Sequence, residues 1–394
     1  MSRLKKKSPV LMRITTVPLS MQVLLKGQPS FMHQHGFRVV MVSNDGPERR
    51  ALMKQESCPH FIMPLTRKIS PFTDLQCLIK LFFLIRKLKP AIVHTHTPKA
   101  GLIGMWAAYF AGVPIRLHTI AGLPWMETSG AMRWLLKTIE KLTFFPATKV
   151  FPNSFKQMDF LKANGLSKQK MEVLGNGSSN GIDTHYFSKT EDILNEAKRL
   201  CINAGVKEAG WVWIFVGRVV NDKGIAELLK SFNEIHRHYP QDQLWILGNQ
   251  EPDLDPLSEE ALHMLNHHDA IKQWGFVHDV RAHLAAAKVL VFPSYREGFP
   301  NVPLQAGAME CALILSDING CNEIVEDKKN GWLVPVKNTE ALSHTMKWAR
   351  ENEEETMRLA KTVRVSIVEK YDRKKMWHIL LEKYCFYLKE KGIV

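Results

Sequence analysis

A carboxylate and a group of small residues follow a short apolar segment near residue 290. Val289 to Phe292 has the length and the β-branched side chains of a buried strand. The tight loop Glu297-Gly298-Phe299-Pro300 comes next, and a helix rich in small residues (Ala306-Gly307-Ala308) begins after it. Open α/β sheets bind phosphorylated ligands at the carboxyl ends of their strands, where helix N-termini present N–H groups. We therefore predict a site of this kind, with Glu297 as its carboxylate.

Two cations stand in the same relation to another predicted strand. Phe215-Val216-Gly217-Arg218 closes that strand, and Asp222-Lys223-Gly224 opens the next helix. Because glycine at position 217 lets the backbone turn tightly, Arg218 and Lys223 can converge on one point. A nucleoside diphosphate leaving group needs such neutralisation, and an Arg fork and a Lys point charge supply it. The alternative is a solvated loop with ordinary surface charges.

The segment from residue 289 onward resembles the E-x7-E signature of family-4 retaining glycosyltransferases of the GT-B fold. Glu297 occupies the first position of that signature, and Gln305 occupies the second. The resemblance continues through residues 316–325 and Asn330-Gly331 and covers nearly the whole chain. The sequence is most similar in these segments to bacterial enzymes that build capsule, O-antigen and related glycans. The resemblance implies an α/β fold of GT-B type, with two Rossmann-like domains whose parallel sheets face each other across a cleft.

The resemblance also implies roles for particular residues. The residues that it assigns to the donor are Gly217, Arg218, Lys223, Gly298, Phe299, Asn301 and Gln305. Glu297 would hold a hydroxyl of the donor sugar, and His118 would position that sugar through its backbone or ring, so these two are the predicted catalytic residues. A lone His at a strand end is also commonly a core residue, and that alternative stays open. No cofactor or metal is implied, because cations neutralise the leaving group.

Gln305 stands where the family pattern has a glutamate that accepts hydrogen bonds from two ribose hydroxyls. An amide keeps one acceptor oxygen and adds two donors, so the contact can persist while the charge is lost. Weaker nucleotide binding is one consequence. A non-catalytic, glycosyltransferase-like binding subunit is the alternative that Gln305 favours.

Positive charge is concentrated in the first half of the chain. Residues 1–190 contain 27 Lys and Arg against 9 Asp and Glu, whereas the remaining residues contain 26 against 30. A basic half predicts an anionic partner. Helix-turn-helix, zinc-finger and RNP-like motifs are absent from the sequence, so we do not expect a nucleic acid as the partner. An anionic membrane surface, contacted peripherally, or a diphosphate-linked glycan acceptor agrees better with the sequence.

Lys99 is the cation that we expect to hold the acceptor. The segment His94-Thr95-His96-Thr97-Pro98-Lys99 follows a predicted strand and precedes a helix, so Lys99 lies at a helix N-terminus, where it can bind a phosphate. Arg67 and Ser70 are predicted to join it.

Two patterns have a metal-binding alternative that we consider less favoured. His94 and His96 would share one strand face, but no third ligand has suitable spacing. Asp253-Leu254-Asp255 has the D-x-D form of metal–nucleotide sites, but it lies several residues beyond its strand between two prolines. We interpret it as a surface loop.

Two apolar segments are either core helices or helices that lie on a membrane. Leu75 to Lys89 is apolar almost throughout, with basic residues near its end. The second segment contains Trp125, Met126, Met132, Trp134 and Leu135. No run of about 18 uninterrupted apolar residues is present, so no transmembrane helix is predicted.

The chain of 394 residues is too long for one ordinary core, which predicts two domains. Apolar strands alternate with helices in both halves, which favours parallel sheets covered on both faces. We place the N-terminal domain at residues 1–187 and the C-terminal domain at 188–370. The resemblance implies that a last helix, 371–394, returns to the N-terminal domain. The six cysteines are scattered, as expected of free thiols in a reducing cytosol.

The predicted function is that of a retaining, metal-independent hexosyltransferase at the cytoplasmic face of the plasma membrane. Its donor would be a nucleotide-sugar, with UDP-hexose or UDP-N-acetylhexosamine favoured by the resemblance, and its acceptor a polyprenyl-diphosphate-linked or other glycan. A nucleotide-sugar epimerase of the same fold is another alternative, although it requires an acid/base set that we do not identify. A nucleic-acid-binding protein would explain the charge but not the loop at Glu297.

Overall fold

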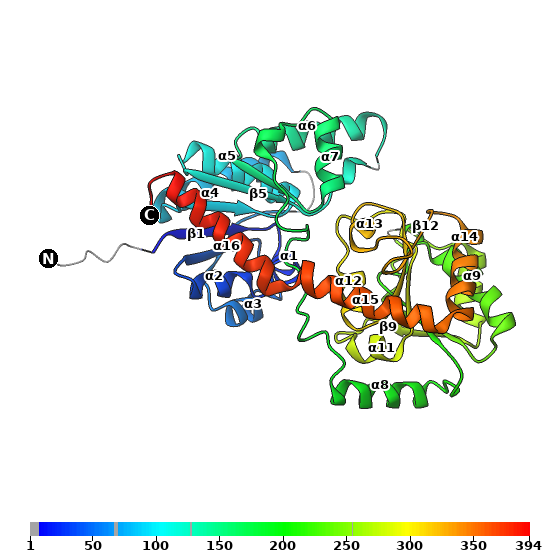
Figure 1. Cartoon of the computed structure of the whole chain (residues 1–394). Coiled ribbons are helices and arrows are strands. Elements are labelled where there is room, and N and C mark those ends of the chain that lie inside the picture. The colour runs from blue at the N-terminus through cyan, green and yellow to red at the C-terminus, as the bar shows by residue number, and fades with distance from the viewer. Residues whose placement is uncertain (1–7, 67–69, 127, 254) are drawn as a thin grey trace. The chain divides into compact units, whose positions relative to one another are not determined.

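The computed structural model describes residues 8–66, 70–126, 128–253 and 255–394, and the chain forms two compact units (Figure 1). Unit 1 consists of the residues up to Gly181 together with Arg373–Val394, and unit 2 consists of Ile182–Asp372. The chain passes between the units at 181/182 and 372/373. The boundaries predicted from the sequence are 187/188 and 370/371.

Each unit contains a six-stranded sheet whose neighbouring strands all pair in parallel. The strands of unit 1, in the spatial order β3-β2-β1-β4-β5-β6, are β1 (Val10–Ile14), β2 (Arg38–Ser43), β3 (His60–Ile62), β4 (Ile92–Thr95), β5 (Ile115–Ile120) and β6 (Lys149–Pro152). The strands of unit 2, in the order β12-β11-β10-β7-β8-β9, are β7 (Val212–Val216), β8 (Gln243–Leu247), β9 (Ile271–Gly275), β10 (Val289–Phe292), β11 (Ala312–Ser316) and β12 (Trp332–Val334). The predicted α/β class with parallel sheets is confirmed.

Helices cover both faces of each sheet. Those of unit 1 are α1 (Pro18–Leu24), α2 (Gln28–Gln34), α3 (Arg49–Glu56), α4 (Pro71–Leu88), α5 (Pro98–Phe110), α6 (Gly130–Phe144), α7 (Phe155–Ala163) and α16 (Arg373–Glu390), with short 3-10 turns at Pro124–Met126 and Lys168–Lys170. Those of unit 2 are α8 (Glu191–Asn203), α9 (Ile225–His238), α10 (Glu259–His267), α11 (Arg281–Ala286), α12 (Asn301–Ala308), α13 (Cys321–Ile324), α14 (Thr339–Glu351) and α15 (Glu353–Tyr371), with a 3-10 turn at Asn221–Lys223.

The central strand β1 shows why these sheets need two helical layers. All five of its residues are buried. Met12 belongs to a core cluster that includes Leu81 of α4, whereas Leu11 belongs to a cluster that includes Leu380 of α16. Successive side chains of a strand point to opposite faces, so an uninterrupted apolar run requires a core on each side.

One helix predicted from the sequence is wrong in its extent. The helical pattern of Gln22 to His35 predicts a single helix, but the structure breaks the chain between α1 and α2 at Gly27. Gly27 has φ +82°, a left-handed conformation that L-residues with side chains rarely adopt. A Cβ at this position would also lie 2.6 Å from the ring of Trp377 in α16. The glycine therefore ends one helix and admits the C-terminal helix into unit 1.

Candidate active site

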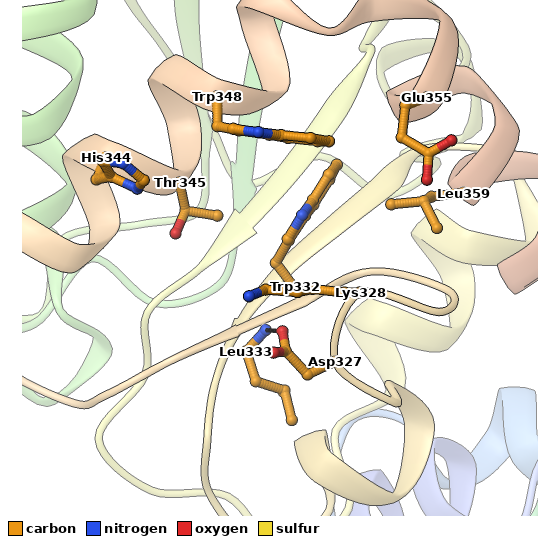
Figure 2. Close-up of a pocket in the computed structure, with 9 residues that line it drawn as sticks. All are labelled: Asp327, Lys328, Trp332, Leu333, His344, Thr345, Trp348, Glu355 and Leu359. Carbon is orange, nitrogen blue, oxygen red and sulfur yellow. Dashed lines mark hydrogen bonds between the residues drawn. The ribbon is translucent and has the colours of Figure 1, made fainter.

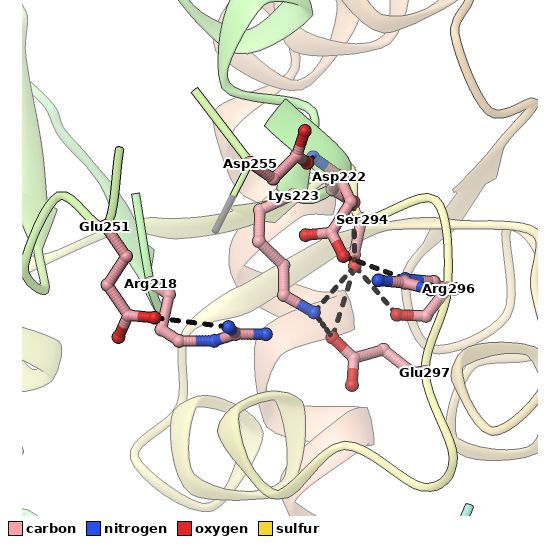
Figure 3. A network of polar contacts seen from close by, with 8 residues as sticks. All are labelled: Arg218, Asp222, Lys223, Glu251, Asp255, Ser294, Arg296 and Glu297. Atoms are coloured by element: carbon pink, nitrogen blue, oxygen red, sulfur yellow. Dashed lines mark hydrogen bonds and ion pairs between the residues drawn. The ribbon is translucent and has the colours of Figure 1, made fainter. Parts of the chain in front are cut away.

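The two predicted donor loops of unit 2 meet at the carboxyl ends of β7 and β10 (Figure 3). The Lys223 Nζ donates to Glu297 Oε1 at 2.7 Å, and the two side chains are 12% and 19% exposed. Ser294, which is fully buried, joins them: its Oγ lies 3.3 Å from Lys223 Nζ and donates to Glu297 Oε1 at 3.2 Å. A cation and a carboxylate predicted from separate parts of the sequence thus form one partly shielded ion pair.

A second ion pair joins the same loops beside the first. Arg296 Nε donates to Asp222 Oδ2 at 2.8 Å, so the neighbours of Glu297 and Lys223 are also linked. The backbone N–H of Asp222 donates to Asp255 Oδ2 at 2.7 Å. This explains one carboxylate of the D-x-D pattern, because Asp255 caps the turn that carries Lys223. The middle residue of that pattern, Leu254, lies outside the described residues.

The loop that follows Glu297 leads directly into α12. Asn301 is the first residue of this helix, after Gly298 and Phe299, so the predicted N–H groups lie at a helix N-terminus of the kind that attracts anions. Asn319 holds the loop from the other side: its Nδ2 donates to the carbonyl oxygen of Gly298 at 2.7 Å. The loop conformation is therefore supported by a residue that follows the neighbouring strand β11.

Gln305 lies in the second turn of α12, on the same helix face as Asn301. Its side chain is partly exposed, and it makes no hydrogen bond to any residue that the structure describes. An unpaired amide at this position is available to a ligand.

Arg218 stands apart from the Lys223 pair. Its guanidinium contacts Glu251 at 3.3 Å, and both side chains are more than two-fifths exposed. Arg218, Gly217 and Glu251 line a cavity of about 260 Å³, together with residues that follow β8 and β9, among them Gly248, Asn249 and Val277. The cavity therefore lies at the carboxyl edge of three adjacent strands.

The ring of His118 lies in the core of unit 1. The residue is 2% exposed, and its Nδ1 is 2.8 Å from Thr95 Oγ1. Helix α5 packs so closely on it that a Cβ at Gly101 would lie 2.5 Å from the imidazole Cε1. Burial lowers the pKa of His118 to about 4, so the ring is neutral near pH 7. The structure thus shows the environment of a core histidine, and a catalytic role for this residue stays a prediction.

The structure brings two of the three predicted acceptor residues together. Lys99 Nζ donates to Ser70 Oγ at 3.4 Å and to Thr66 Oγ1 at 3.2 Å. It also forms an ion pair of 2.8 Å with Asp74 in the first turn of α4, so the lysine already has a counter-ion. Arg67 lies outside the described residues.

His94 and His96 do not resemble metal ligands. Both nitrogens of His94 are engaged, by Tyr384 at 2.6 Å and by Thr119 at 2.8 Å. Within residues 8–66, 70–126, 128–253 and 255–394, no group of three metal-ligating side chains is present. Both histidines instead belong to a buried polar network around Arg13.

A further cavity, of about 520 Å³, lies elsewhere in unit 2 (Figure 2). Trp332 and Trp348 meet in it edge to face, with ring centroids 5.7 Å apart. It shares no lining residue with the donor loops, so it is not part of the candidate active site.

Helix α4 has one buried face and one exposed apolar face. The exposed side chains, which we call the apolar face of α4, are Phe72, Leu75, Ile79 and Phe83, between 47% and 91% exposed. The opposite face (Cys77, Leu81, Ile85) is in the core, so the helix is both a core helix and an apolar surface. In the second apolar segment Trp125 is buried, whereas Trp134 of α6 is 70% exposed. No described helix is long and apolar enough to cross a membrane.

Several residues of the site were not predicted from the sequence. Ser294, Asp222 and Asn319 support the loops that carry Lys223 and Glu297. Ser294 and Asp222 are sequence neighbours of predicted residues, and that proximity was a usable signal. Nothing in the local sequence shows that Asn319 bonds the loop after β10, because the contact depends on the pairing of β10 with β11.

Comparison with known proteins identifies relatives over the whole chain. Residues 202–365 match the family described as glycosyl transferases group 1, and residues 31–177 match the glycosyl transferase 4-like domain. The capsular polysaccharide biosynthesis glycosyltransferase CapM of Staphylococcus aureus is 31% identical over 385 residues, which cover 98% of this chain and 99% of that protein. An Escherichia coli UDP-Gal:alpha-D-GlcNAc-diphosphoundecaprenol alpha-1,3-galactosyltransferase is 28% identical over 73% of each chain.

Solved structures show the same fold. Anabaena Alr3699/HepE in complex with UDP has a TM-score of 0.79 with 16% sequence identity, and the match covers 96% of this chain and 99% of that one. A sucrose-phosphate synthase from Thermosynechococcus elongatus has a TM-score of 0.77 with 19% identity, over 97% of this chain and 100% of that one.

Proposed function

Given that this chain belongs to the family-4 glycosyltransferases of the GT-B fold and acts in surface glycan synthesis, we propose that its donor is a UDP-hexose or UDP-N-acetylhexosamine. We propose as acceptor a glycan on a polyprenyl diphosphate. The observation that carries the proposal is the Lys223–Glu297 pair at the carboxyl edge of β7 and β10, beside the N-terminus of α12. This arrangement places a cation for a leaving group next to an acceptor for sugar hydroxyls.

Donor binding would exchange one partner of Lys223 for another. A diphosphate oxygen competes with Glu297 for the ammonium group, and charge-assisted hydrogen bonds to phosphate are strong. Glu297, released from Lys223, would then accept a hydrogen bond from a hydroxyl group of the donor sugar. Arg218 has an exposed guanidinium whose pairing with Glu251 contributes little, so it can turn to the same diphosphate.

The nucleoside would occupy the cavity of about 260 Å³ beside Arg218. Val277 and Phe276 give this cavity an apolar wall against which a planar base could stack. Gln305 would hold the ribose through its unpaired amide. The UDP complexes of the structural relative Alr3699/HepE support a uridine nucleotide over other classes.

Transfer with retention is the chemistry that these groups favour. The acceptor hydroxyl would attack the anomeric carbon from the face that the diphosphate leaves, and its proton would pass to the departing phosphate oxygen. Glu297 is engaged with Lys223, and no second carboxylate among the described residues is bonded to it, unlike the carboxylate pair of a glycosidase. The protein would therefore act by positioning and by stabilising the leaving group with Lys223 and Arg218 in place of a metal ion.

We propose that the apolar face of α4 contacts a membrane surface. Phe72, Leu75, Ile79 and Phe83 recur at helical spacing and stay exposed, whereas soluble surfaces rarely keep such rows of apolar side chains. Lys80, Arg86, Lys87 and Lys89 are exposed on or just after the same helix. An apolar stripe beside basic residues is typical of helices that lie on anionic membranes, where a lipid-linked acceptor would be found.

The test is release of nucleoside diphosphate from a panel of UDP- and GDP-sugars, with membrane lipid extract as acceptor. We expect UDP release by the wild type and loss of it in Glu297→Ala. Activity that appears only in Gln305→Glu would instead identify the natural chain as a binding subunit. Turnover that survives Glu297→Ala would contradict the proposed role of the ion pair.

A further inference from the structure

Unit 1 contains a buried arginine without a carboxylate hydrogen-bond partner. Arg13 on β1 is fully buried, and its hydrogen bonds go to His96, Tyr384 and Gln28, which are all neutral acceptors among the described residues. Glu56 is the nearby acid, but its two oxygens accept from the backbone N–H groups of Gly27 and Ser30. Burial lowers the pKa of Arg13, yet a guanidinium remains charged in proteins. Arg13 therefore has an acid nearby, but no carboxylate among the described residues bonds its guanidinium directly.

This arginine fixes the tautomer of His96. A guanidinium can only donate, and Arg13 Nε lies 3.1 Å from His96 Nε2, so that ring nitrogen must accept. The ring proton of neutral His96 is therefore on Nδ1. Burial and the nearby His94 and Arg13 hold the pKa of His96 well below its usual value, which keeps the ring neutral. Nδ1 is buried and has no partner among the described residues, so it is a donor without an acceptor.

A second chain of hydrogen bonds starts at the same guanidinium. Arg13 Nη1 donates to Tyr384 at 3.0 Å, so the Tyr384 proton must go to His94 Nδ1, 2.6 Å away. His94 then carries its proton on Nε2 and donates to Thr119 Oγ1 at 2.8 Å. The Thr119 hydroxyl accepts this bond, which leaves its own proton to donate elsewhere. The buried guanidinium of Arg13 therefore orients two hydrogen-bond donors, the Nδ1–H of His96 and the hydroxyl of Thr119.

Both donors reach the same small cavity. His96, Thr119, Asn153 and Ser178 are among the residues that line it, at the carboxyl ends of β4, β5 and β6. Its volume is about 10 Å³, enough for about one water molecule. No acidic side chain lines it in the part of the chain that the structure describes. The cavity therefore offers hydrogen-bond donors and positive potential to a single oxygen atom.

We infer that this cavity receives one oxygen of an anionic group, and that the group is the diphosphate of the lipid-linked acceptor. The cavity favours an anion because its donors are already oriented by a desolvated cation, and charge-assisted bonds are the strongest of their kind. The edge of the sheet at which it opens is the one where α/β sheets bind ligands. The identity of the ligand rests on the proposed function, whereas the anion preference rests on the network alone.

Farnesyl diphosphate is the probe, applied to the full chain with UDP at saturation so that the donor loops of unit 2 are occupied. We expect binding to shift the ¹⁵N signal of His96 Nδ1 and its proton. Inorganic pyrophosphate should produce the same shift more weakly, and farnesol should not produce it. A shift by pyrophosphate equal to that by farnesyl diphosphate would assign the site to free phosphate ligands rather than to a lipid-linked one.

Thr119→Val tests the site without removing the arginine. The variant keeps the shape of the side chain but removes the hydroxyl, which is both the proposed donor to the ligand and the acceptor of the His94 bond, so we expect the Kd for farnesyl diphosphate to rise about tenfold. Thr143→Val, which removes an equally buried hydroxyl from α6 of the same unit, should leave that Kd unchanged.

Equal affinity in Thr119→Val and wild type, an unmoved His96 signal, or no binding of the probe would overturn the inference and leave the cavity to an ordered water. In a working transferase, Thr119→Val should raise the KM for the acceptor but not for the UDP-sugar. A different result is possible, in which no UDP-sugar is turned over but farnesyl diphosphate still binds the wild type more tightly than Thr119→Val. The proposed function would then fail, and the anion site would stand.

Discussion

The carboxyl edges of the two sheets handle charge in opposite ways. In unit 2, Lys223 and Arg218 each have a carboxylate partner, and both pairs are in contact with solvent. In unit 1, Arg13 is buried and bonded only to neutral groups. A ligand of unit 2 must therefore displace an internal partner, whereas a ligand of unit 1 would meet donors that are already oriented. The same fold thus supports one site whose cations exchange a carboxylate for the ligand and another whose hydrogen-bond donors are oriented before the ligand binds.

The comparison predicts its largest effect at Lys223. Lys223→Ala should lower kcat/KM for the UDP-sugar about 10³-fold, because the leaving group loses its most shielded cation. The melting temperature should also fall, since the variant leaves the partly buried Glu297 without its counter-ion. UDP release measures the first effect and calorimetry the second. Lys288→Ala, which breaks an exposed pair with Glu353, is the control; a Lys223→Ala activity equal to that of the control would refute the assignment.

A large effect on stability is expected at Arg13. Arg13→Met leaves three buried partners without their donor and should destabilise unit 1 by about 3 kcal/mol. Urea unfolding measures this value, and limited proteolysis should show earlier cleavage of α16, which Arg13 bonds through Tyr384. Arg358→Met, at an exposed pair in unit 2, should leave the urea midpoint almost unchanged. Equal values for the two variants would contradict the contrast between the units.

Glu140 of α6 tests whether unit 1 also buries a negative group without a counter-ion. Burial raises the pKa of this carboxyl to about 7 from 4.5. The folded state therefore holds the proton more tightly than the unfolded state, so stability is full below about pH 4.5 and falls as pH rises through 7. Glu140→Gln should remove this loss and be more stable than wild type at pH 8 by about 2 kcal/mol, with little difference at pH 4.5. Parallel pH profiles for both proteins would show that the carboxyl is not perturbed.

The smallest expected effect concerns Gln305. Gln305→Glu adds a carboxylate beside the proposed ribose position, and we expect the Kd for UDP to fall about tenfold, the equivalent of one charge-assisted hydrogen bond. Calorimetric titration with UDP measures it. Gln273→Glu, on β9 in the same unit, controls for added negative charge. Weaker UDP binding in Gln305→Glu would mean that the amide does not face the ribose.

Local patterns in the sequence were enough to predict the donor loops. Lys223 and Glu297 each follow a recognisable apolar strand, and parallel strands place such residues at one edge. Their direct pairing, and the support from Asn319, depend on which strands are neighbours. The local sequence does not contain that information.

The network of unit 1 could not be predicted in the same way. Arg13 lies near the start of the chain and Tyr384 in the last helix, and no local pattern in the sequence links them. They meet across 371 positions of sequence because α16 packs on β1. A contact of this range has no local signature, and the pair His94 and His96 was therefore interpreted only as a weak metal pattern.

Several strands were also not predicted. β3 and β12 have three residues each, too short for a periodic pattern. β9 is an edge strand with mostly exposed or half-exposed residues and an irregular register at its end. β11, by contrast, is a fully buried A-L-I-L-S run that the same reasoning as for β10 would have identified.

The positions where the chain leaves and re-enters unit 1 have a consequence for its synthesis. Ile182 N–H donates to the carbonyl of Tyr371 at 2.8 Å, so the two ends of unit 2 are tied side by side, and this unit is an insertion within the other. A ribosome therefore completes unit 2 while unit 1 still lacks α16, whose Leu380 and Tyr384 belong to its core. Unit 1, whose synthesis begins first, is therefore completed last. Loss of the final 22 residues should accordingly spare a folded unit 2 and leave unit 1 as a target for chaperones and proteases.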